Sequence, residues 1–293
     1  MTKILITGAN GQLGSEIRKL ADLFPDVRFV FTDVNELDIT NPEAVEKMVA
    51  DENPQWLVNC AAYTAVDKAE TDDETAWLIN AVAPAILSEK SKAAGCRFIQ
   101  VSTDYVFDGR NHRPYVEEDE VSPTSVYGTT KLEGELISLA NNPETLVIRT
   151  SWLYSSFGNN FVKSMIRLGT ERDQLNVIFD QVGTPTYAGD LAVAILEIIR
   201  KSSSGLQDFV PGVYHFSNEG VCSWFDFAIA IHQIYGINCS VNAIESKDYP
   251  SPVARPHYSV LNKSKIKSTF GIQIPYWRTS LEKCIQEIKN QQS

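Results

Sequence analysis

Short apolar runs alternate with longer amphipathic segments throughout the first half of this 293-residue chain. Five of these runs are apolar enough to be buried on both faces, as the strands of a parallel sheet are. We expect strands at residues 3–7, 28–32, 56–60, 97–102 and 145–149, with helices between them near 12–23, 42–51, 66–93 and 125–140. This repeated order predicts an α/β fold, a doubly wound parallel sheet covered by helices.

The pattern loosens after about Thr150. Proline-rich loops, such as residues 249–257, separate helices predicted near 160–171, 189–201, 223–235 and 277–289 and strands at 176–180, 213–217 and 240–245. We therefore expect residues 1–150 to form a Rossmann-type domain and residues 151–293 to form mainly a smaller C-terminal lid. The segments near 176–200 and 212–218 are expected to return to the main domain.

The composition excludes several classes of function. The formal net charge is −11, so nucleic acid and anionic membrane surfaces are not expected as partners. The five cysteines are scattered without a CxxC or Cys/His cluster, which favours reduced thiols over a zinc site or disulfides. No apolar run approaches the ~18 residues of a membrane span, and the start of the chain does not resemble a signal peptide. We expect a cytoplasmic protein.

Three glycines follow the first predicted strand at the spacing G-x-x-G-x-x-G. They lie where a strand passes into a helix, which is the context in which backbone amides cradle a pyrophosphate. The first glycine would make the turn, the second would let the backbone approach the phosphates, and the third would let helix and strand pack closely. A tight turn without a ligand is the competing interpretation. The candidate cofactor loop comprises Gly8, Asn10, Gly11, Gln12, Leu13 and Gly14.

Asp33 follows the second predicted strand. A carboxylate there would accept hydrogen bonds from the adenosine ribose and repel a 2′-phosphate. No arginine directly follows Asp33 to bind that phosphate. The sequence therefore favours NADH over NADPH, although an ordinary turn aspartate would look the same.

Three polar side chains are predicted to meet at the carboxyl ends of the strands, where ligands of open parallel sheets bind. Thr103 ends the fourth predicted strand, and Tyr127 and Lys131 share one face of the next helix. Tyr127 can donate a proton to a developing alkoxide, and Thr103 can donate a hydrogen bond to the same oxygen. Lys131 can lower the pKa of the phenol and hold the nicotinamide ribose. The Tyr–Lys spacing alone also occurs by chance on solvated helices.

The glycine spacing and this constellation resemble the extended short-chain dehydrogenase/reductases, whose members act largely on nucleotide sugars. Sugar-nucleotide dehydratases have a similar site but carry Glu where this chain has Tyr105. A dehydratase that keeps its cofactor bound is therefore disfavoured. Five further strings are similar to the reductases of dTDP-4-dehydro-L-rhamnose within this family. They are STDYVFDG (102–109), NCAAYTAVDKAE (59–70), RTSWLYSSFGNNF (149–161), DQVGTPT (180–186) and PVARPHYSVLN (252–262).

The resemblance implies further cofactor residues. Asp38 and Ile39 match the pair that contacts adenine, and Ala61, Ala62, Tyr63 and Thr64 match the loop that lines the cofactor. From the residues alone, Asp38 could equally cap a helix, and the alanines could simply allow close packing.

The resemblance also implies substrate-binding residues in both halves of the chain. Trp152 matches a tryptophan that lies against the sugar, and Asn160 and Arg255 fall in the lid, where the nucleotide diphosphate should lie. A core tryptophan and ordinary loop residues are the competing interpretations. The implied substrate-binding set is Thr103, Asp104, Trp152, Asn160 and Arg255.

The activity implied by the resemblance is the NAD(P)H-dependent reduction of the C4 ketone of dTDP-4-dehydro-L-rhamnose to dTDP-L-rhamnose, with Tyr127 as the proton donor. One alternative is a sibling reductase of another 4-keto-6-deoxy sugar nucleotide. Another is a non-catalytic regulatory subunit that resembles the methionine adenosyltransferase β subunit. The lid is then expected to bind the dTDP-sugar substrate, and the protein to be a monomer or homodimer.

Some members of the family join two subunits through magnesium held by three glutamates. Two of these match Glu16 and Glu287, but the third falls on Gly189, beside Asp190. We therefore predict no metal, doubt a metal-bridged dimer, and expect Glu16 and Glu287 to be ordinary surface carboxylates.

Overall fold

The computed structural model describes residues 1–249 and 251–292, so Pro250 of the predicted loop at 249–257 lies outside it. A six-stranded sheet in the order β10-β5-β4-β3-β1-β2 forms its centre, and its strand pairs are parallel. The five strands predicted in the first half of the chain are confirmed. The strands of this sheet are β1 (Thr2–Thr7), β2 (Val27–Phe31), β3 (Trp56–Asn59), β4 (Arg97–Thr103), β5 (Thr145–Thr150) and β10 (Gly212–His215).

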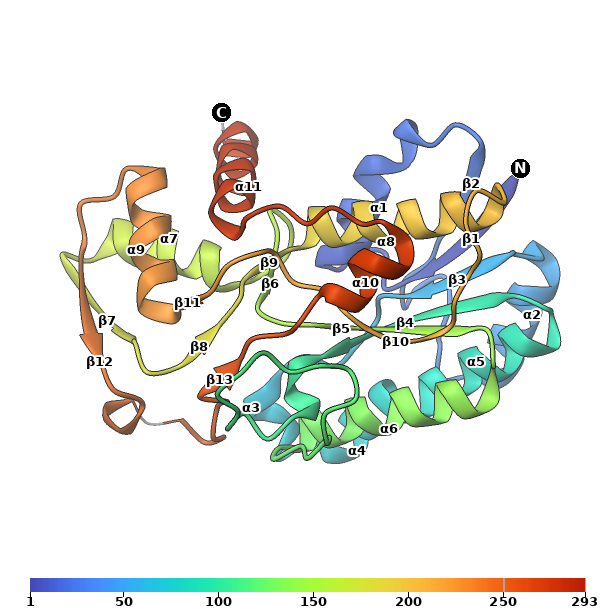
Figure 1. The fold of residues 1–293 in the computed structure, drawn as a ribbon, viewed down its shortest axis with the longest axis horizontal. Helices are drawn as coiled ribbons and strands as arrows, with labels where there is room; N and C mark the ends of the chain where they lie inside the picture. The colour runs from blue at the N-terminus through green and yellow to red at the C-terminus, as the bar shows by residue number, and fades with distance from the viewer. Residues whose placement is uncertain (250, 293) are drawn as a thin grey trace.

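Helices cover both faces of this sheet, as Figure 1 shows. On one face, α1 (Gln12–Leu20) and α8 (Ala188–Ser203) pack together and join a buried apolar cluster with the strands. On the other face, α2 (Pro42–Glu52) and α5 (Ala83–Ala93) bury a second cluster, with α6 (Val126–Asn141) beside α5. The predicted doubly wound α/β fold is therefore confirmed.

Local sequence explains where two of these helices begin. The side chain of Asn41 accepts hydrogen bonds from the backbone N–H groups of Glu43 and Ala44, both at 3.0 Å, and Pro42 opens α2. This agrees with the preference for a polar cap followed by proline. The side chain of Ser125 accepts a hydrogen bond from the N–H of Gly128 at 3.1 Å and so caps α6.

The helical pattern predicted at 66–93 divides into several pieces. These are α3 (Val66–Ala69), α4 (Asp73–Trp77), a π-helical turn, η2 (Leu78–Val82), and then α5. The side-chain amide of Asn80, in the π-helical turn, exchanges two hydrogen bonds with the backbone of Tyr63. The turn therefore supports the loop that follows β3, in line with the frequent location of such turns near functional sites.

Much of the second half forms a separate apolar core on the left of Figure 1. There, α7 (Phe161–Glu171) and α9 (Trp224–Tyr235) pack together, α11 (Trp277–Gln292) packs on α9, and β7 (Gln174–Ile178) pairs with β12 (Ser240–Ile244). Short pairings lie between the two cores: β6 (Leu153–Tyr154) with β9 (Thr186–Tyr187), and β8 (Val182–Gly183) with β11 (Cys222–Ser223) and β13 (Tyr258–Ser259).

Two segments of the second half contact the main sheet. Strand β10 pairs with β5, and α8 packs against α1, whereas β7 pairs with β12 away from this sheet. A further helix, α10 (Ser264–Phe270), contacts β10. The remaining elements are the short 3-10 turns η1 (Ala21–Leu23), η3 (Asp104–Val106) and η4 (Ser246–Asp248).

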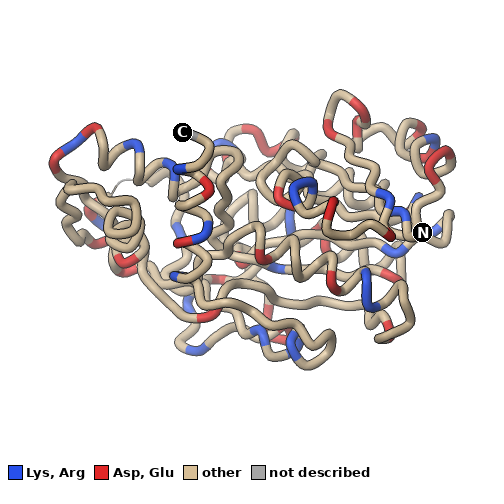
Figure 2. Tube along the Cα trace, turned by 90° about the horizontal axis from the view of Figure 1, so that it is seen from above, with Lys and Arg blue, Asp and Glu red and all other residues tan. Residues whose placement is uncertain are grey.

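Positive and negative residues are mixed along the chain, as Figure 2 shows. Among residues 1–249 and 251–292, no helix combines the length and apolar character needed to span a bilayer.

Candidate active site

Thr103 ends β4, and the Tyr127 side chain lies close to it in the first turn of α6. Lys131 follows one turn later on the same face of α6. Gly128 makes this approach possible, because a Cβ atom there would collide with the backbone carbonyl oxygen of Tyr105 in η3. The rings of Tyr105 and Tyr127 then lie edge to face, with centroids 5.4 Å apart. The Thr103 hydroxyl lies close to the Tyr127 phenol and lowers its pKa.

Tyr127 is 9% exposed. Burial raises the pKa of its phenol above the ordinary value, and the nearby Asp104 and Tyr105 raise it further, while the hydrogen bond with Thr103 lowers it. The phenol is therefore held in its protonated form at neutral pH. A protonated phenol at the carboxyl end of a sheet strand suits a proton donor better than a base.

Lys131 is 3% exposed, and its Nζ donates a hydrogen bond to the carbonyl oxygen of Val101 at 2.7 Å. Burial lowers the pKa of this ammonium group to about 8, and the charge of Glu135 opposes that shift. An ammonium group carries three N–H donors, so Lys131 has capacity left for a ligand.

Asp104 is buried beside Thr103. The Thr103 hydroxyl donates to Asp104 Oδ1 at 3.0 Å and accepts from the backbone N–H of Tyr105 at 3.2 Å. Burial raises the pKa of Asp104 to about 6, while the hydrogen bond from Thr103 opposes this. Asp104 Oδ2 has no partner among the described residues, so this carboxyl can accept a further hydrogen bond.

The glycine loop lies at the point where the strand order reverses, between β1 and β3. Gly8 has a φ of +65°, and a Cβ there would lie 2.6 Å from the backbone nitrogen of Ala61, which follows β3. A Cβ at Gly14 would lie 2.5 Å from the Cα of Ala9. At Gly11 a Cβ would meet only the oxygen of Gly8, at 3.2 Å. The fold itself therefore explains Gly8 and Gly14, whereas the open side of Gly11 leaves room for a ligand.

The first turn of α1 has no side-chain cap and no acidic residue. Its N–H groups and the exposed Gly11 therefore form an uncapped positive helix end, which fits a phosphate group. Asn10 and Gln12 flank this position, and Leu13 is buried in the core beneath it.

Asp33 faces the glycine loop. Its Oδ2 accepts a hydrogen bond from the backbone N–H of Asn10 at 2.8 Å, and its Oδ1 accepts one from Val34 at 2.8 Å. Asp38 is exposed and accepts hydrogen bonds from the backbone and hydroxyl of Thr40. Asn41 caps α2, so Asp38 does not perform that task, and Ile39 beside it packs on the α2–α5 core.

The segment 61–64 follows the carboxyl end of β3, beside the glycine loop. Ala61 donates its N–H to Asn59 Oδ1 at 3.1 Å, and the Tyr63 hydroxyl donates to Asp72 at 2.9 Å. Ala62 is partly exposed and Thr64 is exposed, so the loop presents small side chains toward solvent beside the glycine loop.

Trp152 stacks on Trp224, with ring centroids 3.5 Å apart and an interplanar angle of 11°. Its φ of +49° is unusual for a bulky residue and holds the indole against α9. The indole is partly exposed, so Trp152 is not a fully buried core residue. Trp224 has no signal in the sequence, because its contact with Trp152 joins positions 72 residues apart and depends on the fold.

The other two predicted lid residues make contacts within the protein. Asn160 caps α7 through Lys163, and its Nδ2 donates to Gln12 Oε1 at 3.0 Å. Arg255 donates to the Tyr105 hydroxyl at 3.3 Å and forms an ion pair with Asp67 at 2.5 Å. Arg255 therefore lies beside the ring that touches Tyr127, whereas Asn160 joins the lid to the glycine loop.

The expectation for Glu16 is wrong. Glu16 is 1% exposed, accepts a hydrogen bond from Ser155 at 2.6 Å, and has its pKa raised by burial. Helix α11 places Glu287 nearby, where its Oε2 accepts from the Tyr187 hydroxyl at 3.0 Å. Burial arises because α1 packs under the 153–158 loop, which periodicity alone does not reveal. Asp190 instead accepts from Asn218 at 2.6 Å. Within the described chain, no three His, Cys, Asp or Glu residues are grouped to hold a metal.

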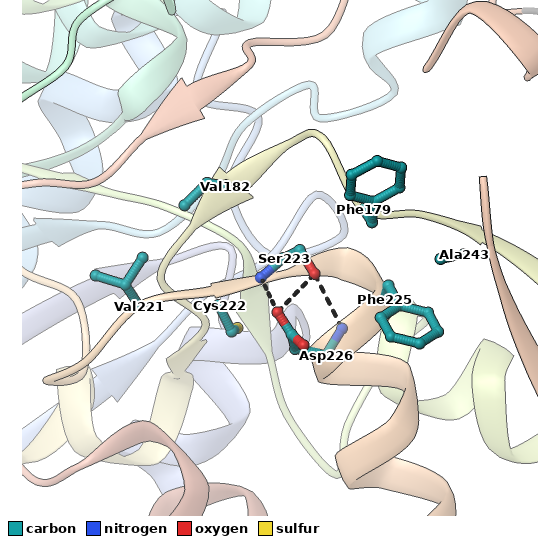
Figure 3. Close-up of a pocket in the computed structure, with 8 residues that line it drawn as sticks. All are labelled: Phe179, Val182, Val221, Cys222, Ser223, Phe225, Asp226 and Ala243. Atoms are coloured by element: carbon teal, nitrogen blue, oxygen red, sulfur yellow. Dashed lines mark hydrogen bonds between the residues drawn. The ribbon is translucent and has the colours of Figure 1, made fainter. Parts of the chain in front are cut away.

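Two cavities lie apart from this constellation. One of about 640 Å³ lies between α4 and the start of α6 and includes Trp77. The other, of about 390 Å³, lies at the start of α9 and is shown in Figure 3. There Asp226 accepts from the N–H and hydroxyl of Ser223 in a capping box, so the side chains that cap α9 are already paired. Neither cavity is lined by Thr103, Tyr127 or Lys131.

Comparisons with known proteins show the family of the chain. A family model described as RmlD substrate binding domain matches residues 1–290. A dTDP-4-dehydrorhamnose reductase of Aggregatibacter actinomycetemcomitans is 41% identical over 288 residues, which cover 96% of this chain and 98% of that protein. The solved dTDP-4-dehydrorhamnose reductase of Clostridium acetobutylicum is 45% identical, with a TM-score of 0.93 over 98% of this chain and 100% of that one.

A second solved relative is the dTDP-4-dehydrorhamnose reductase of Bacillus anthracis in complex with NADP. It is 37% identical, with a TM-score of 0.92 over 98% of this chain and 100% of that one. The resemblance inferred from the sequence is confirmed. The chain belongs to the dTDP-4-dehydrorhamnose reductase family of oxidoreductases.

Proposed function

We propose that this protein uses NADH or NADPH to reduce the C4 ketone of dTDP-4-dehydro-L-rhamnose to dTDP-L-rhamnose. The observation that carries the proposal is the burial of Tyr127 close to Thr103 at the carboxyl end of β4, with the buried Lys131 one turn further along the same face of α6. Relatives that are named for this reaction and match nearly the whole chain support the choice of substrate.

The protein residues would act on the oxygen of the C4 carbonyl. Tyr127 donates its phenolic proton to that oxygen as negative charge develops there, and Thr103 donates a hydrogen bond to the same atom. For this, the Thr103 hydroxyl must turn from Asp104 to the substrate. The ammonium group of Lys131 stabilises the phenolate that Tyr127 becomes.

The glycine loop, Asp33 and Lys131 fit a nicotinamide dinucleotide. Gly11 and the uncapped start of α1 would receive the pyrophosphate, Asp33 the adenosine ribose and Lys131 the nicotinamide ribose. When bound, the dihydronicotinamide supplies the hydride that reduces C4. Asp38, Ile39 and the 61–64 loop would complete this binding site.

The sugar nucleotide would bind between the two cores. Trp152 offers a partly exposed indole for the pyranose, and Arg255 offers a guanidinium group for the diphosphate next to Tyr105. In this division, residues 1–150 hold the cofactor and residues 151–293 mainly hold the sugar nucleotide, with β10 and α8 returned to the main sheet. Asp104 would contact the substrate through its free oxygen, and Asn160 would contact it only by exchanging its present partners.

The test is to supply the protein with each cofactor and a panel of 4-keto-6-deoxy sugar nucleotides. We expect oxidation of the nicotinamide cofactor, fastest with dTDP-4-dehydro-L-rhamnose, and dTDP-L-rhamnose as the product. Faster turnover of another sugar would identify a sibling reductase. No oxidation with any pair, together with a stoichiometric protein partner, would instead favour a regulatory subunit.

A further inference from the structure

Glu135 lies one helical turn beyond Lys131 on the same face of α6. Tyr127, Lys131 and Glu135 thus form a stripe at i, i+4 and i+8, and all three are buried. Glu135 is 1% exposed. A carboxylate is rarely buried without a specific partner, so its place behind the active-site lysine requires an explanation.

The partner of Glu135 is Arg149 on β5. Arg149 Nε donates to both carboxylate oxygens at 3.1 Å, and Arg149 Nη2 donates to Oε2 at 2.8 Å. This fork-like arrangement fixes the carboxylate in orientation as well as in distance.

The sheet register places this ion pair next to Lys131. Lys131 donates to the carbonyl of Val101 on β4, and Arg149 pairs in register with Ser102, the next residue of that strand. The ion pair therefore lies between α6 and the sheet, directly behind the lysine.

The other neighbours of Lys131 are largely uncharged. From β4 it meets a carbonyl group, and from η2 the amide of Asn80 bonds to Thr130 on α6. The Asp104 carboxyl raises the pKa of Tyr127. The charge of Glu135 raises the pKa of Lys131. Arg149 is the further cation on this side of α6, and it forms an ion pair with Glu135.

We propose that Glu135, held in place by Arg149, is a positioning residue that keeps Lys131 in its charged form at neutral pH. Burial works against the ammonium form, and a fixed anion one turn away offsets this. The claim about the charge of Lys131 is independent of the reaction, while its kinetic consequence rests on the proposed function.

The sign of the effect follows from the charge. The protonated form of Lys131 is present below its pKa of about 8, so activity that needs the ammonium should fall as the pH rises through that value. Removing the negative charge of Glu135 should lower the pKa of Lys131 further and move this decline to lower pH, by about 1 unit.

The test compares Glu135→Gln, the double variant Glu135→Gln/Arg149→Met and the control Glu133→Gln with the wild type. Glu133 lies on the same helix, but its carboxylate accepts from the Trp77 indole. Lysine labelled with ¹³C at Cε allows direct NMR titration of Lys131, assigned by loss of its signal in Lys131→Met. The pH dependence of kcat/KM for the sugar nucleotide is measured in parallel.

The double variant separates charge from folding, because replacing both members of a buried ion pair by neutral groups is far less costly than removing one. We expect it to melt nearer the wild-type temperature than Glu135→Gln. Its Lys131 midpoint should lie between those of Glu135→Gln and the wild type, because loss of the Arg149 charge offsets part of the loss of the Glu135 charge. Glu133→Gln should titrate like the wild type. A wild-type midpoint for Lys131 in both folded variants, Glu135→Gln and the double variant, would overturn the proposal. If the NMR shift appears in a protein without reductase activity, the proposed function fails and this inference stands.

Discussion

The carboxylate of Asp33 makes two hydrogen bonds within the protein, to the N–H groups of Asn10 and Val34. It therefore lies against the glycine loop, where a carboxylate would repel a 2′-phosphate. The Bacillus anthracis relative was solved with NADP, so the preference of this chain has to be measured rather than carried over.

We expect Asp33→Ser to raise kcat/KM for NADPH relative to NADH by about tenfold, because the charge that repels the extra phosphate is removed. Steady-state kinetics with both cofactors measure the ratio. Asp26→Ser is the matched control, since Asp26 is exposed before the opposite end of β2. A ratio that does not change in Asp33→Ser would remove this residue from cofactor selection.

Individual residues also show which parts of the candidate site can be predicted from the sequence. Spacing predicts Thr103, Tyr127, Lys131 and the three glycines as candidates, because each has a fixed relation to the end of a strand or the start of a helix. Trp224 and Arg149 were not found, since Trp152–Trp224 and Glu135–Arg149 are contacts across the fold. Periodicity does not give the partner of a side chain.

At the scale of elements, the loop between β1 and α1 separates two uses of glycine. Gly14 lets α1 pack against Ala9, whereas a Cβ at Gly11 would meet only the oxygen of Gly8. Alanine at the two positions should therefore have different consequences.

Gly14→Ala should lower the free energy of unfolding by about 1–3 kcal/mol, because the new methyl group meets backbone atoms that have to move. Gly11→Ala should leave stability within about 1 kcal/mol but weaken nicotinamide cofactor binding at least about tenfold by blocking the approach of the phosphates. Denaturant unfolding and calorimetric titration of the cofactor measure the two effects. Normal cofactor affinity in Gly11→Ala would contradict the assignment of this loop.

Element boundaries were predictable where local chemistry sets them, as at Asn41 and Pro42. The break of the 66–93 helix into α3, α4, the π-helical turn and α5 was missed. It depends on Asn80, whose amide bonds to the backbone of Tyr63 in another element. A tertiary contact of this kind overrides the helical pattern.

At the scale of the whole molecule, His215 makes stability depend on pH. It is fully buried on β10, and burial together with the Arg149 charge lowers its pKa to about 3. The unfolded chain binds a proton near pH 6.5 and the folded chain does not, so folding becomes less favourable as the pH falls below 6.5 toward 3.

Between pH 7 and pH 5, this group should lower the free energy of unfolding by about 2 kcal/mol. Urea unfolding at both pH values measures the change. In His215→Gln the loss of unfolding free energy between pH 7 and pH 5 should be smaller by that amount. In the control His112→Gln, at an exposed loop position, this loss should stay as in the wild type. An equal loss in His215→Gln and in the wild type would show that another group is responsible.

The alternation of strands and helices was sufficient to predict the main sheet, since each predicted strand is apolar on both faces. The lid was harder, because its strands are short and pair in several small sheets. The burial of Glu16 was missed for a related reason: it depends on how α1 and α11 meet the 153–158 loop.

The central claim is that Tyr127 provides the proton that completes a ketone reduction. The most direct measurement is the single-turnover rate of nicotinamide oxidation by Tyr127→Phe with dTDP-4-dehydro-L-rhamnose, together with its cofactor affinity. Tyr276→Phe, at a half-exposed tyrosine next to α11, is the control. We predict a rate about 10²–10⁴-fold below the wild type with cofactor affinity retained, because only the proton donor is lost. A rate within a few-fold of the wild type would contradict the account.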